Sequence, residues 1–442
     1  MSDHTPIYLD HNATTEPGAE VLAAMLEGMR SLWANPSSTH APGQAARRAL
    51  VAARGKVAAL LGCQAAELVF TSGATEANHM AVLGALALGR RQGRHRLVLS
   101  AVEHPGLLAL AERLKGEGTP VDLIGVDDQG RLDLDQARRL IRGDEALVSV
   151  MGANNETGVT MPVSDVAELA HAAGALLHVD ATQLLGKSVE TFESCGADLW
   201  SVSAHKIHGP KGIGALVVRK GLALPALLSG RQERQRRGGT ENLPAILGFA
   251  AAADRCLATL DADLAHMAAL TLRLESGLSA ALPQLHRYGP LAMRLPNTSC
   301  LRFGALDADQ VLGRLERAGV LASSGAACSA GGTQPSHVLL AMGVSPLHAK
   351  AAVRFSIGRH TSEADIDRAI EAACLAIGPL LQAEVAVAPP AATAASAQTG
   401  AKPHTGEATA WAGVSSGIGT ATASVTAGTA PAPMQRADAL PA

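Results

Sequence analysis

Hydrophobic residues in the first half of the chain alternate between short continuous runs and longer segments with helical spacing. The short runs are LVFT, RLVLS, ALVSVM, ALLHVD and ADLWSVSA, each bounded by Gly, Pro or polar residues. Such runs are typical of buried strands, and we expect RLVLSAVEHP to end at His104 and ALVSVMGANN to end at Asn154 and Asn155. Strands that alternate with helices predict an α/β fold with a mainly parallel, doubly wound sheet.

The pattern changes near Asp254. A long helical segment, TSCLRFGA, a helix, a Gly-rich loop, another helix, VRFSIG and a last helix follow, which predicts a smaller α+β domain. After about Gln382 the composition shifts to Ala, Thr, Pro, Gly and Ser, which bury too little surface to offset the entropy of ordering. We therefore expect an N-terminal segment over 1–20 that joins the small domain, a large domain over 21–254, a small domain over 255–382 and a disordered tail over 383–442.

Composition narrows the functional classes. The 442-residue chain has a net charge of −3 and no basic cluster interleaved with aromatic residues, which argues against a nucleic-acid binder. The N-terminus has an early acid and no apolar core, and we see no uncharged apolar stretch of about 18 residues, so we expect neither a secretory signal nor a membrane span. Cysteines without CxxC spacing are typical of reduced thiols in a cytoplasmic enzyme. They are Cys63, Cys195, Cys256, Cys300, Cys328 and Cys374.

Two predicted strands end on groups that could act together. ALLHVD ends at Asp180, and ADLWSVSA ends at His205 and Lys206. Open α/β sheets carry their chemistry beyond the carboxyl ends of the strands, so we expect the acid and the lysine at one rim. A cofactor with a pyridinium nitrogen and an aldehyde needs a carboxylate for the nitrogen and an amine for the aldehyde. The pair predicts pyridoxal 5′-phosphate.

Other lysines in this stretch are weaker candidates. Lys187 follows a turn, where we expect a solvated ammonium group, and Lys211 lies in the HGPKGIG loop and is expected to face solvent. Lys206 alone directly follows a buried strand, where desolvation would lower the pKa of its amine. ATQLLGKS nearly matches a phosphate-binding P-loop, but Ala181 stands where that loop needs Gly.

Further polar residues surround the same predicted rim. TSGATEAN, residues 71–78, predicts a turn into a helix whose first N–H groups would bind a phosphate, although Ser and Thr also begin helices as ordinary caps. A strand-end histidine such as His104 is usually structural, but here its ring could stack on the cofactor and move protons. An acidic strand end at Asp180 could instead bind a metal, but no partner carboxylates are spaced to help.

Three loops add candidate groups. RQERQRRGGTEN is a basic run that carries Thr240 and is either a solvated charge run or a loop that reaches a phosphate, in its own or a partner subunit. Cys328 lies in SSGAACSAGG, where small residues leave the thiol on a flexible loop that can reach a substrate and then an acceptor. Arg354 in VRFSIGRH could clamp a substrate carboxylate, with Asn35 in ANPSSTH assisting.

These segments together carry a family likeness. YLDHNATT, NPSSTH, TSGATEAN, VEHP, ANNETG, HVDATQ, SAHKIHGPKG, RRGGTEN, SSGAACSAG, PSHV and VRFSIGR resemble the class V aminotransferase-like cysteine desulfurases, and most closely their nitrogen-fixation type. The likeness runs in order from about Ile7 to about Ile377. Within it, Ala204 replaces the Gly or Cys often found before the His-Lys pair, GAAC replaces GSAC, and the Ala/Thr/Pro tail replaces the usual C-terminal segment.

The resemblance implies a cytoplasmic homodimer of the fold-type-I pyridoxal phosphate enzymes, with a mainly parallel seven-stranded sheet and a smaller α+β domain. Such an enzyme converts L-cysteine to L-alanine and passes sulfur to an iron–sulfur scaffold protein, with no nucleic acid or membrane partner. In the implied site, the cofactor phosphate binds Ala74, Thr75, Ser203 and His205, with Thr240 from the other subunit. Asn155 and Gln183 contact the cofactor ring, His104 stacks on it, Asp180 pairs with its nitrogen and Lys206 binds its aldehyde. The substrate carboxylate binds Arg354 and Asn35, and Cys328 is the nucleophile. No intrinsic metal is implied, and Cys328 is a candidate for a transient iron–sulfur ligand.

Other functions remain open from the sequence. A small-substrate aminotransferase of the same fold would need no Cys328 and would produce a keto acid. A selenocysteine lyase would differ in substrate, and a sulfur-carrier or scaffold-binding protein would show no turnover.

Overall fold

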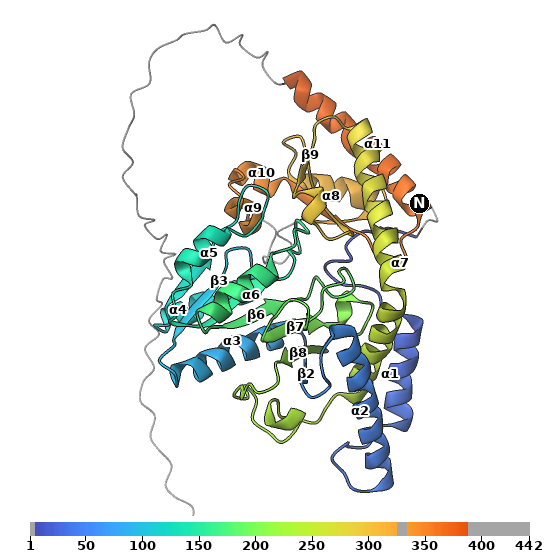
Figure 1. Ribbon diagram of the computed structural model, residues 1–442. Coiled ribbons are helices and arrows are strands. Elements are labelled where there is room, and N and C mark those ends of the chain that lie inside the picture. The colour runs from blue at the N-terminus through green and yellow to red at the C-terminus, as the bar shows by residue number, and fades with distance from the viewer. Residues whose placement is uncertain (1–4, 325–333, 388–442) are drawn as a thin grey trace, which may run out of the picture. The chain divides into compact units, whose positions relative to one another are not determined.

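The structure is a computed structural model of the 442-residue chain, and it describes residues 5–324 and 334–387 (Figure 1). Cys328 and the predicted tail from residue 388 onward lie outside the described residues. The described residues belong to one compact unit.

A seven-stranded sheet supports the N-terminal half of the chain. Its strands are β2 (Leu68–Thr71), β3 (Arg96–Ser100), β4 (Val121–Ile124), β5 (Glu145–Met151), β6 (Leu176–Asp180), β7 (Leu199–Ser203) and β8 (Gly214–Val218). They lie in the order β2-β8-β7-β6-β5-β3-β4, and only the pairs that β8 makes with β2 and β7 are antiparallel. The predicted mainly parallel sheet is confirmed.

Two predicted strand ends were placed too far along the chain. The strand predicted to end at His104 ends at Ser100, because a turn follows and the His104 ring accepts the Gly106 N–H at the start of α4 (Pro105–Gly116). The strand predicted to end at Asn154 and Asn155 ends at Met151. In both cases the polar residues lie on loops beyond the sheet.

Helices cover both faces of the sheet. They are α1 (Ala19–Ser31), α2 (Ala41–Leu61), α3 (Ala74–Arg90), α4, α5 (Leu134–Leu140) and α6 (Val163–Ala172). Successive strand residues point to opposite faces. Leu97 and Leu99 accordingly join the core formed with α3 and α4, whereas Val98 joins the core that contains residues of α2 and α6.

The long helix α7 (Leu243–Ala281) spans residue 254, where the sequence pattern changes. It runs beside α1 and α2 and extends to α11 (Glu363–Val387) (Figure 1). By length and hydropathy, α7 is the one helix in the described part of the chain that could cross a membrane. Half of its most apolar window is buried inside the fold, as expected for a helix of a protein core.

A second, four-stranded antiparallel sheet follows α7, with its own apolar core. Its order is β12 (Ser323–Ser324), β13 (Ala352–Ser356), β10 (Thr298–Phe303) and β9 (Leu285–Tyr288). The N-terminal strand β1 (Ile7–Tyr8) pairs with β11 (Val320–Leu321). The remaining helices are α8 (Ala308–Arg317), α9 (His337–Ala341) and α10 (Pro346–Lys350).

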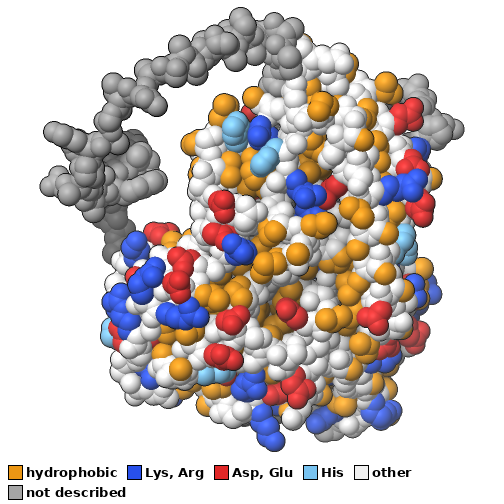
Figure 2. Space-filling model, turned by 45° about the horizontal axis from the view of Figure 1, so that its top comes forward, with side chains coloured by type: hydrophobic (Ala, Val, Ile, Leu, Met, Phe, Trp, Pro, Cys, Tyr) orange, Lys and Arg blue, Asp and Glu red, His pale blue; other side chains and the backbone are white. Residues whose placement is uncertain are grey.

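Charged side chains of both signs are interspersed over the face seen in Figure 2. On that face the basic side chains do not form a single continuous patch.

Candidate active site

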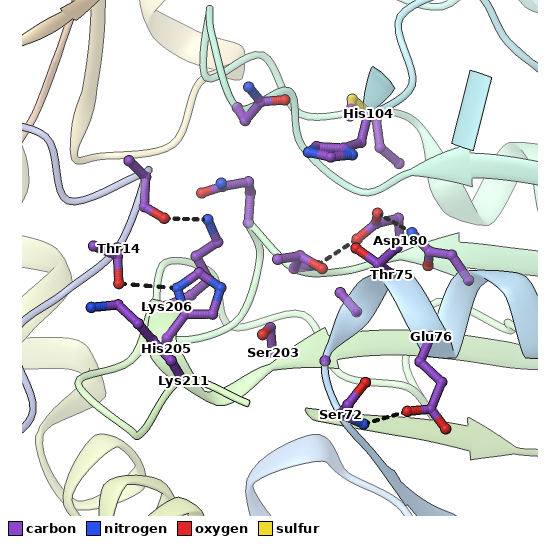
Figure 3. Close-up of a pocket in the computed structure, with 18 of the residues that line it drawn as sticks. Thr14, Ser72, Thr75, Glu76, His104, Asp180, Ser203, His205, Lys206 and Lys211 are labelled. Carbon is purple, nitrogen blue, oxygen red and sulfur yellow. Dashed lines mark hydrogen bonds between the residues drawn. The ribbon is translucent and has the colours of Figure 1, made fainter. Parts of the chain in front are cut away.

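A cavity of about 600 Å³ lies at the carboxyl ends of β5, β6 and β7, next to the start of α3 (Figure 3). Parallel strands bring their carboxyl ends to one edge, so residues far apart in the sequence meet there. The predicted residues that line the cavity are Ala74, Thr75, His104, Asn155, Asp180, Gln183, Ser203, His205 and Lys206.

Asp180 and Lys206 lie on different sides of this cavity (Figure 3). The Asp180 carboxylate is buried and accepts hydrogen bonds from the Asn78 side chain at 2.8 Å and the Thr182 N–H at 3.0 Å. Lys206 lies on the 3₁₀ turn that follows β7, and its Nζ donates to the Asn12 carbonyl at 2.6 Å and the Ala13 carbonyl at 2.9 Å. Each group is therefore held in place before any ligand binds.

The start of α3 forms an anion cradle. The first N–H groups of a helix have no partners within the helix, and the helix dipole makes this end positive. Gly73 precedes the helix with a φ of 157° and a ψ of 179°, and a Cβ on it would meet only the Ser203 hydroxyl, at 3.7 Å. A side chain here would therefore project into open space beside Ser203, where a phosphate has room.

His205 lines the cavity on the side opposite the start of α3 (Figure 3). Its Nδ1 is 3.1 Å from the Thr14 hydroxyl. Burial, followed by the nearby charges of Lys206, Lys187 and Lys211, lowers the pKa of His205 to about 4. The ring is therefore neutral near pH 7 and can offer an N–H to an anion, but not a positive charge.

His104 lines the cavity from the start of α4 and does not end a strand. Burial lowers its pKa, with a smaller opposing effect from Asp180. Its Nδ1 accepts the Gly106 N–H at 3.1 Å, so Nε2 carries the proton of the neutral ring. The structure thus gives this ring a capping role as well as a face on the cavity.

Asn12 is a residue that sequence reasoning missed. Its backbone carbonyl accepts hydrogen bonds from Lys206 and, at 3.1 Å, from Gln183, and its side chain donates to the Asn155 carbonyl at 3.2 Å. The only local signal was its position in the DHNATT motif, because its partners come from distant parts of the chain.

The prediction that Lys187 is solvated was wrong. Its side chain is buried, and its Nζ lies 2.6 Å from Gln183 Oε1 and 2.9 Å from Asn12 Oδ1. The N-terminal segment that carries Asn12 covers this turn, which local sequence cannot reveal. Lys211 is exposed, as predicted, at the edge of the cavity. No helix begins at the P-loop-like ATQLLGKS, whose residues form turns, so this segment lacks the geometry of a P-loop.

Three predicted residues do not line this cavity. Asn35 and Thr240 are exposed on loops. Arg354 is buried, and its guanidinium donates to Asp10 Oδ1 at 2.6 Å and to the Asn155 carbonyl at 3.0 Å, behind the cavity wall. Cys328 lies outside the described residues, so its position relative to the cavity stays a prediction.

The described residues fit pyridoxal 5′-phosphate. A carboxylate, a lysine amine and a helix N-terminus border one cavity, and these are the groups that a pyridine nitrogen, an aldehyde and a phosphate require. The buried Asn78 Oδ1 and Thr182 Oγ1 have no hydrogen-bond partner among the described residues and leave polar capacity beside Asp180. Within the same residues, no group of three or more His, Cys, Asp or Glu side chains is arranged to hold a metal ion.

Comparison with known proteins agrees with this chemistry. Residues 7–369 match the family model described as aminotransferase class-V. A cysteine desulfurase of Cereibacter sphaeroides is 46% identical over 368 residues, which cover 83% of this chain and 94% of that protein. A solved NifS-like protein is 33% identical with a TM-score of 0.79, and the match covers 84% of this chain and 99% of that one.

A further solved structure, of SspA in complex with cysteine, is 29% identical with a TM-score of 0.68, and the match covers 80% of this chain and 99% of that one. These matches confirm the fold class and the predicted resemblance. The chain therefore belongs to the class V aminotransferase family, among relatives that are cysteine desulfurases.

Proposed function

We propose that this chain is a pyridoxal 5′-phosphate-dependent cysteine desulfurase that converts L-cysteine to L-alanine and retains the sulfur as a persulfide on Cys328. The observation that carries the proposal is the placement of Asp180, Lys206 and the start of α3 around one cavity. The curated relatives that are cysteine desulfurases support the choice of reaction within the family.

Each part of the cofactor would be held by a different group of this chain. The start of α3, Ser203 and His205 would hold the phosphate, and Asp180 would hold the ring nitrogen in its protonated form. When bound, the cofactor supplies a sink for the negative charge that develops at the substrate Cα. Lys206 would hold the cofactor aldehyde and, once displaced by the substrate amine, would take the Cα proton.

Cys328 would act on the substrate sulfur. Its thiolate forms an S–S bond to that sulfur while the Cβ–S bond of the substrate breaks, and the bonding electron pair remains on the substrate carbon. Protonation of that carbon gives the methyl group of alanine, so the carbon is reduced as the transferred sulfur is oxidised. The step needs no external oxidant.

The other cysteines are poor nucleophiles. Burial raises the pKa of Cys63, Cys256 and Cys300 to about 12 and that of Cys195 to about 11, and it also raises the pKa of Cys374. Thiolates are the reactive form of cysteine. None of the described thiols is therefore suited to the reaction, which supports Cys328.

Partners and location are part of the same proposal. We propose L-cysteine as substrate, consistent with the relative solved in complex with cysteine. Thr240 does not line the cavity of its own chain, which supports a homodimer in which this loop serves the partner's phosphate site. An iron–sulfur scaffold protein would accept the sulfur in the cytoplasm, with Cys328 as a transient cluster ligand and nitrogen fixation as one setting.

Product analysis tests the reaction. Purified protein with pyridoxal phosphate, L-cysteine and a thiol reductant should form alanine and sulfide in equal amounts, and Cys328→Ala should bind cysteine but release no sulfide. A keto acid in place of alanine would identify an aminotransferase, and turnover of selenocysteine without cysteine would identify a selenocysteine lyase. Sulfide formation by Cys328→Ala at the wild-type rate would refute the assigned nucleophile.

A further inference from the structure

A second lysine lies directly behind the cavity wall. Lys187, in the turn after β6, is 4% exposed. Its Nζ contacts two amide oxygens, Gln183 Oε1 at 2.6 Å and Asn12 Oδ1 at 2.9 Å. In the described part of the chain no carboxylate forms an ion pair with it. A buried lysine that contacts only neutral acceptors is unusual, because burying an unpaired charge is costly.

The two contacts of Lys187 match the number of N–H donors on a neutral amine. Burial, followed by repulsion from Lys206 and Arg354, lowers its pKa well below the ordinary value. A neutral amine has two N–H donors. The two amide oxygens would accept both N–H donors of the neutral form.

These contacts fix the orientation of the Gln183 side chain. The two ends of an amide have nearly the same shape, so neighbouring donors and acceptors decide which end points where. Gln183 Oε1 faces the Lys187 amine, and Gln183 Nε2 donates to the Asn12 carbonyl at 3.1 Å. Rotating the amide by 180° would place its oxygen against that carbonyl. With the observed orientation, Nε2 retains a second N–H for the cavity that Gln183 lines.

The Lys187 amine also contacts Asn12. The Asn12 side-chain oxygen accepts from Lys187 and, at 3.1 Å, from Asn297, while the Asn12 backbone carbonyl accepts from Lys206 at 2.6 Å. Lys187 therefore contacts Gln183, which lines the cavity, and Asn12, whose carbonyl accepts from Lys206.

We propose that Lys187 is a positioning residue, which keeps an N–H of Gln183 directed at the cofactor ring. The proposal rests on the proposed use of pyridoxal phosphate. It assigns Lys187 no contact with substrate or cofactor. The group that benefits is an oxygen on the ring, because an N–H donor there stabilises its anionic form.

A double-mutant cycle tests the proposal. Lys187→Met keeps the length of the side chain and removes its donors, and Gln183→Leu removes the amide that Lys187 orients. Equilibrium titration of the cofactor-free protein with pyridoxal phosphate should show about tenfold weaker binding for each single variant. The double variant should be no weaker than Gln183→Leu alone, because residues that act through one another are not additive. Independent, multiplying losses would overturn the proposal.

The bound cofactor's visible absorption band gives a second measurement. The pH at which this band titrates should shift upward by about half a unit to one unit in both Lys187→Met and Gln183→Leu. Without the N–H donated by Gln183, the anionic ring oxygen is less stabilised, so the proton that lies beside it is lost only at a higher pH. Lys115→Met, at an exposed position of α4, should change neither the binding nor the band. A fall in melting temperature for Lys187→Met with unchanged binding and unchanged band would show a purely structural lysine and refute the proposal.

These measurements distinguish failure of the proposal for Lys187 from failure of the proposed function. If Lys187→Met alone does not fold, the double variant, which removes amine and amide together, is compared with Gln183→Leu, and weaker binding by the double variant would count against the proposal. The readouts are cofactor affinity and spectrum, so they do not depend on which product wild-type protein forms. Absence of cofactor binding by wild-type protein would instead refute the proposed function.

Discussion

The side-chain amide of Asn78 donates a hydrogen bond to the Asp180 carboxylate, with Nδ2 and Oδ2 2.8 Å apart. Asn78 comes from α3, the helix whose first turn forms the anion cradle, and Asp180 ends β6. One helix thus supplies the proposed phosphate site and orients the acid that is proposed to hold the ring nitrogen. Helix α3 therefore connects the two proposed ends of the cofactor site.

Asn78→Leu should weaken binding of pyridoxal phosphate about tenfold or more, because a buried hydrogen bond to a charged group contributes about 1.5–3 kcal/mol. Equilibrium titration of the cofactor-free protein measures the effect. Gln92→Leu makes the same chemical change at an exposed position beyond α3 and should leave the affinity unchanged. Equal affinity for Asn78→Leu and wild type would show that Asp180 needs no support from α3.

Stability should fall with rising pH because of Glu103. Its carboxyl is fully buried, and burial, reinforced by Asp180, raises its pKa to about 8 from an ordinary value of 4.5. Between these values the native state keeps a proton that the unfolded state has lost. The free energy of unfolding should therefore fall by up to about 1.4 kcal/mol per pH unit from this group.

Glu103→Gln cannot titrate and should remove this dependence. Urea denaturation of both proteins at pH 5, 6.5 and 8 gives the difference in unfolding free energy, which should move in favour of the variant as the pH rises. A difference that stays constant across this range would mean that Glu103 is ionised in the native protein.

The loop that carries Thr240 is held by a buried ion pair. Glu233 accepts hydrogen bonds from Arg54 at 2.5 and 2.8 Å and from the Phe70 N–H at 2.9 Å. Glu233, Arg234 and Gln235 all have positive φ, at 44°, 54° and 65°, a conformation that costs non-glycine residues energy. The buried pair offsets that cost.

Glu233→Gln should lower the free energy of unfolding by about 3 kcal/mol or more, because it leaves Arg54 with a buried, uncompensated charge. Lys56→Gln breaks the exposed pair with Asp254, whose charged atoms are 2.6 Å apart, and should cost about 1 kcal/mol or less. Urea denaturation compares the two. Similar losses for both variants would show that the Arg54–Glu233 pair does not anchor the loop.

Local sequence patterns predicted part of this site and missed the rest for a definable reason. Asp180 and Lys206 could be found because each follows an apolar run that ends abruptly. Lys187 was misassigned because its burial depends on the N-terminal segment, which packs over it from a distant part of the sequence. Asn12 has polar neighbours and no periodic signal, and its partners, such as Asn297, lie hundreds of residues away.

Arg354 shows the same limit. Its position at the strand β13 was predicted, but its ion pair with Asp10 at 2.6 Å was not. The guanidinium is 3% exposed, and its Nε has no hydrogen-bond partner among the described residues. A buried donor without an acceptor is costly, so this group retains capacity for a further anion.

If Arg354 clamps the substrate carboxylate, Arg354→Lys should raise KM for cysteine about tenfold or more while kcat changes by a few fold at most. An ammonium group cannot make the paired, planar hydrogen bonds of a guanidinium, and each 1.4 kcal/mol lost in binding is a factor of ten. Steady-state alanine formation over a range of cysteine concentrations separates the two constants. Arg287→Lys, also at an ion-paired arginine of the small sheet, should change neither. An unchanged KM together with a lower free energy of unfolding would assign Arg354 a structural role through Asp10, and the substrate carboxylate would then need another cation.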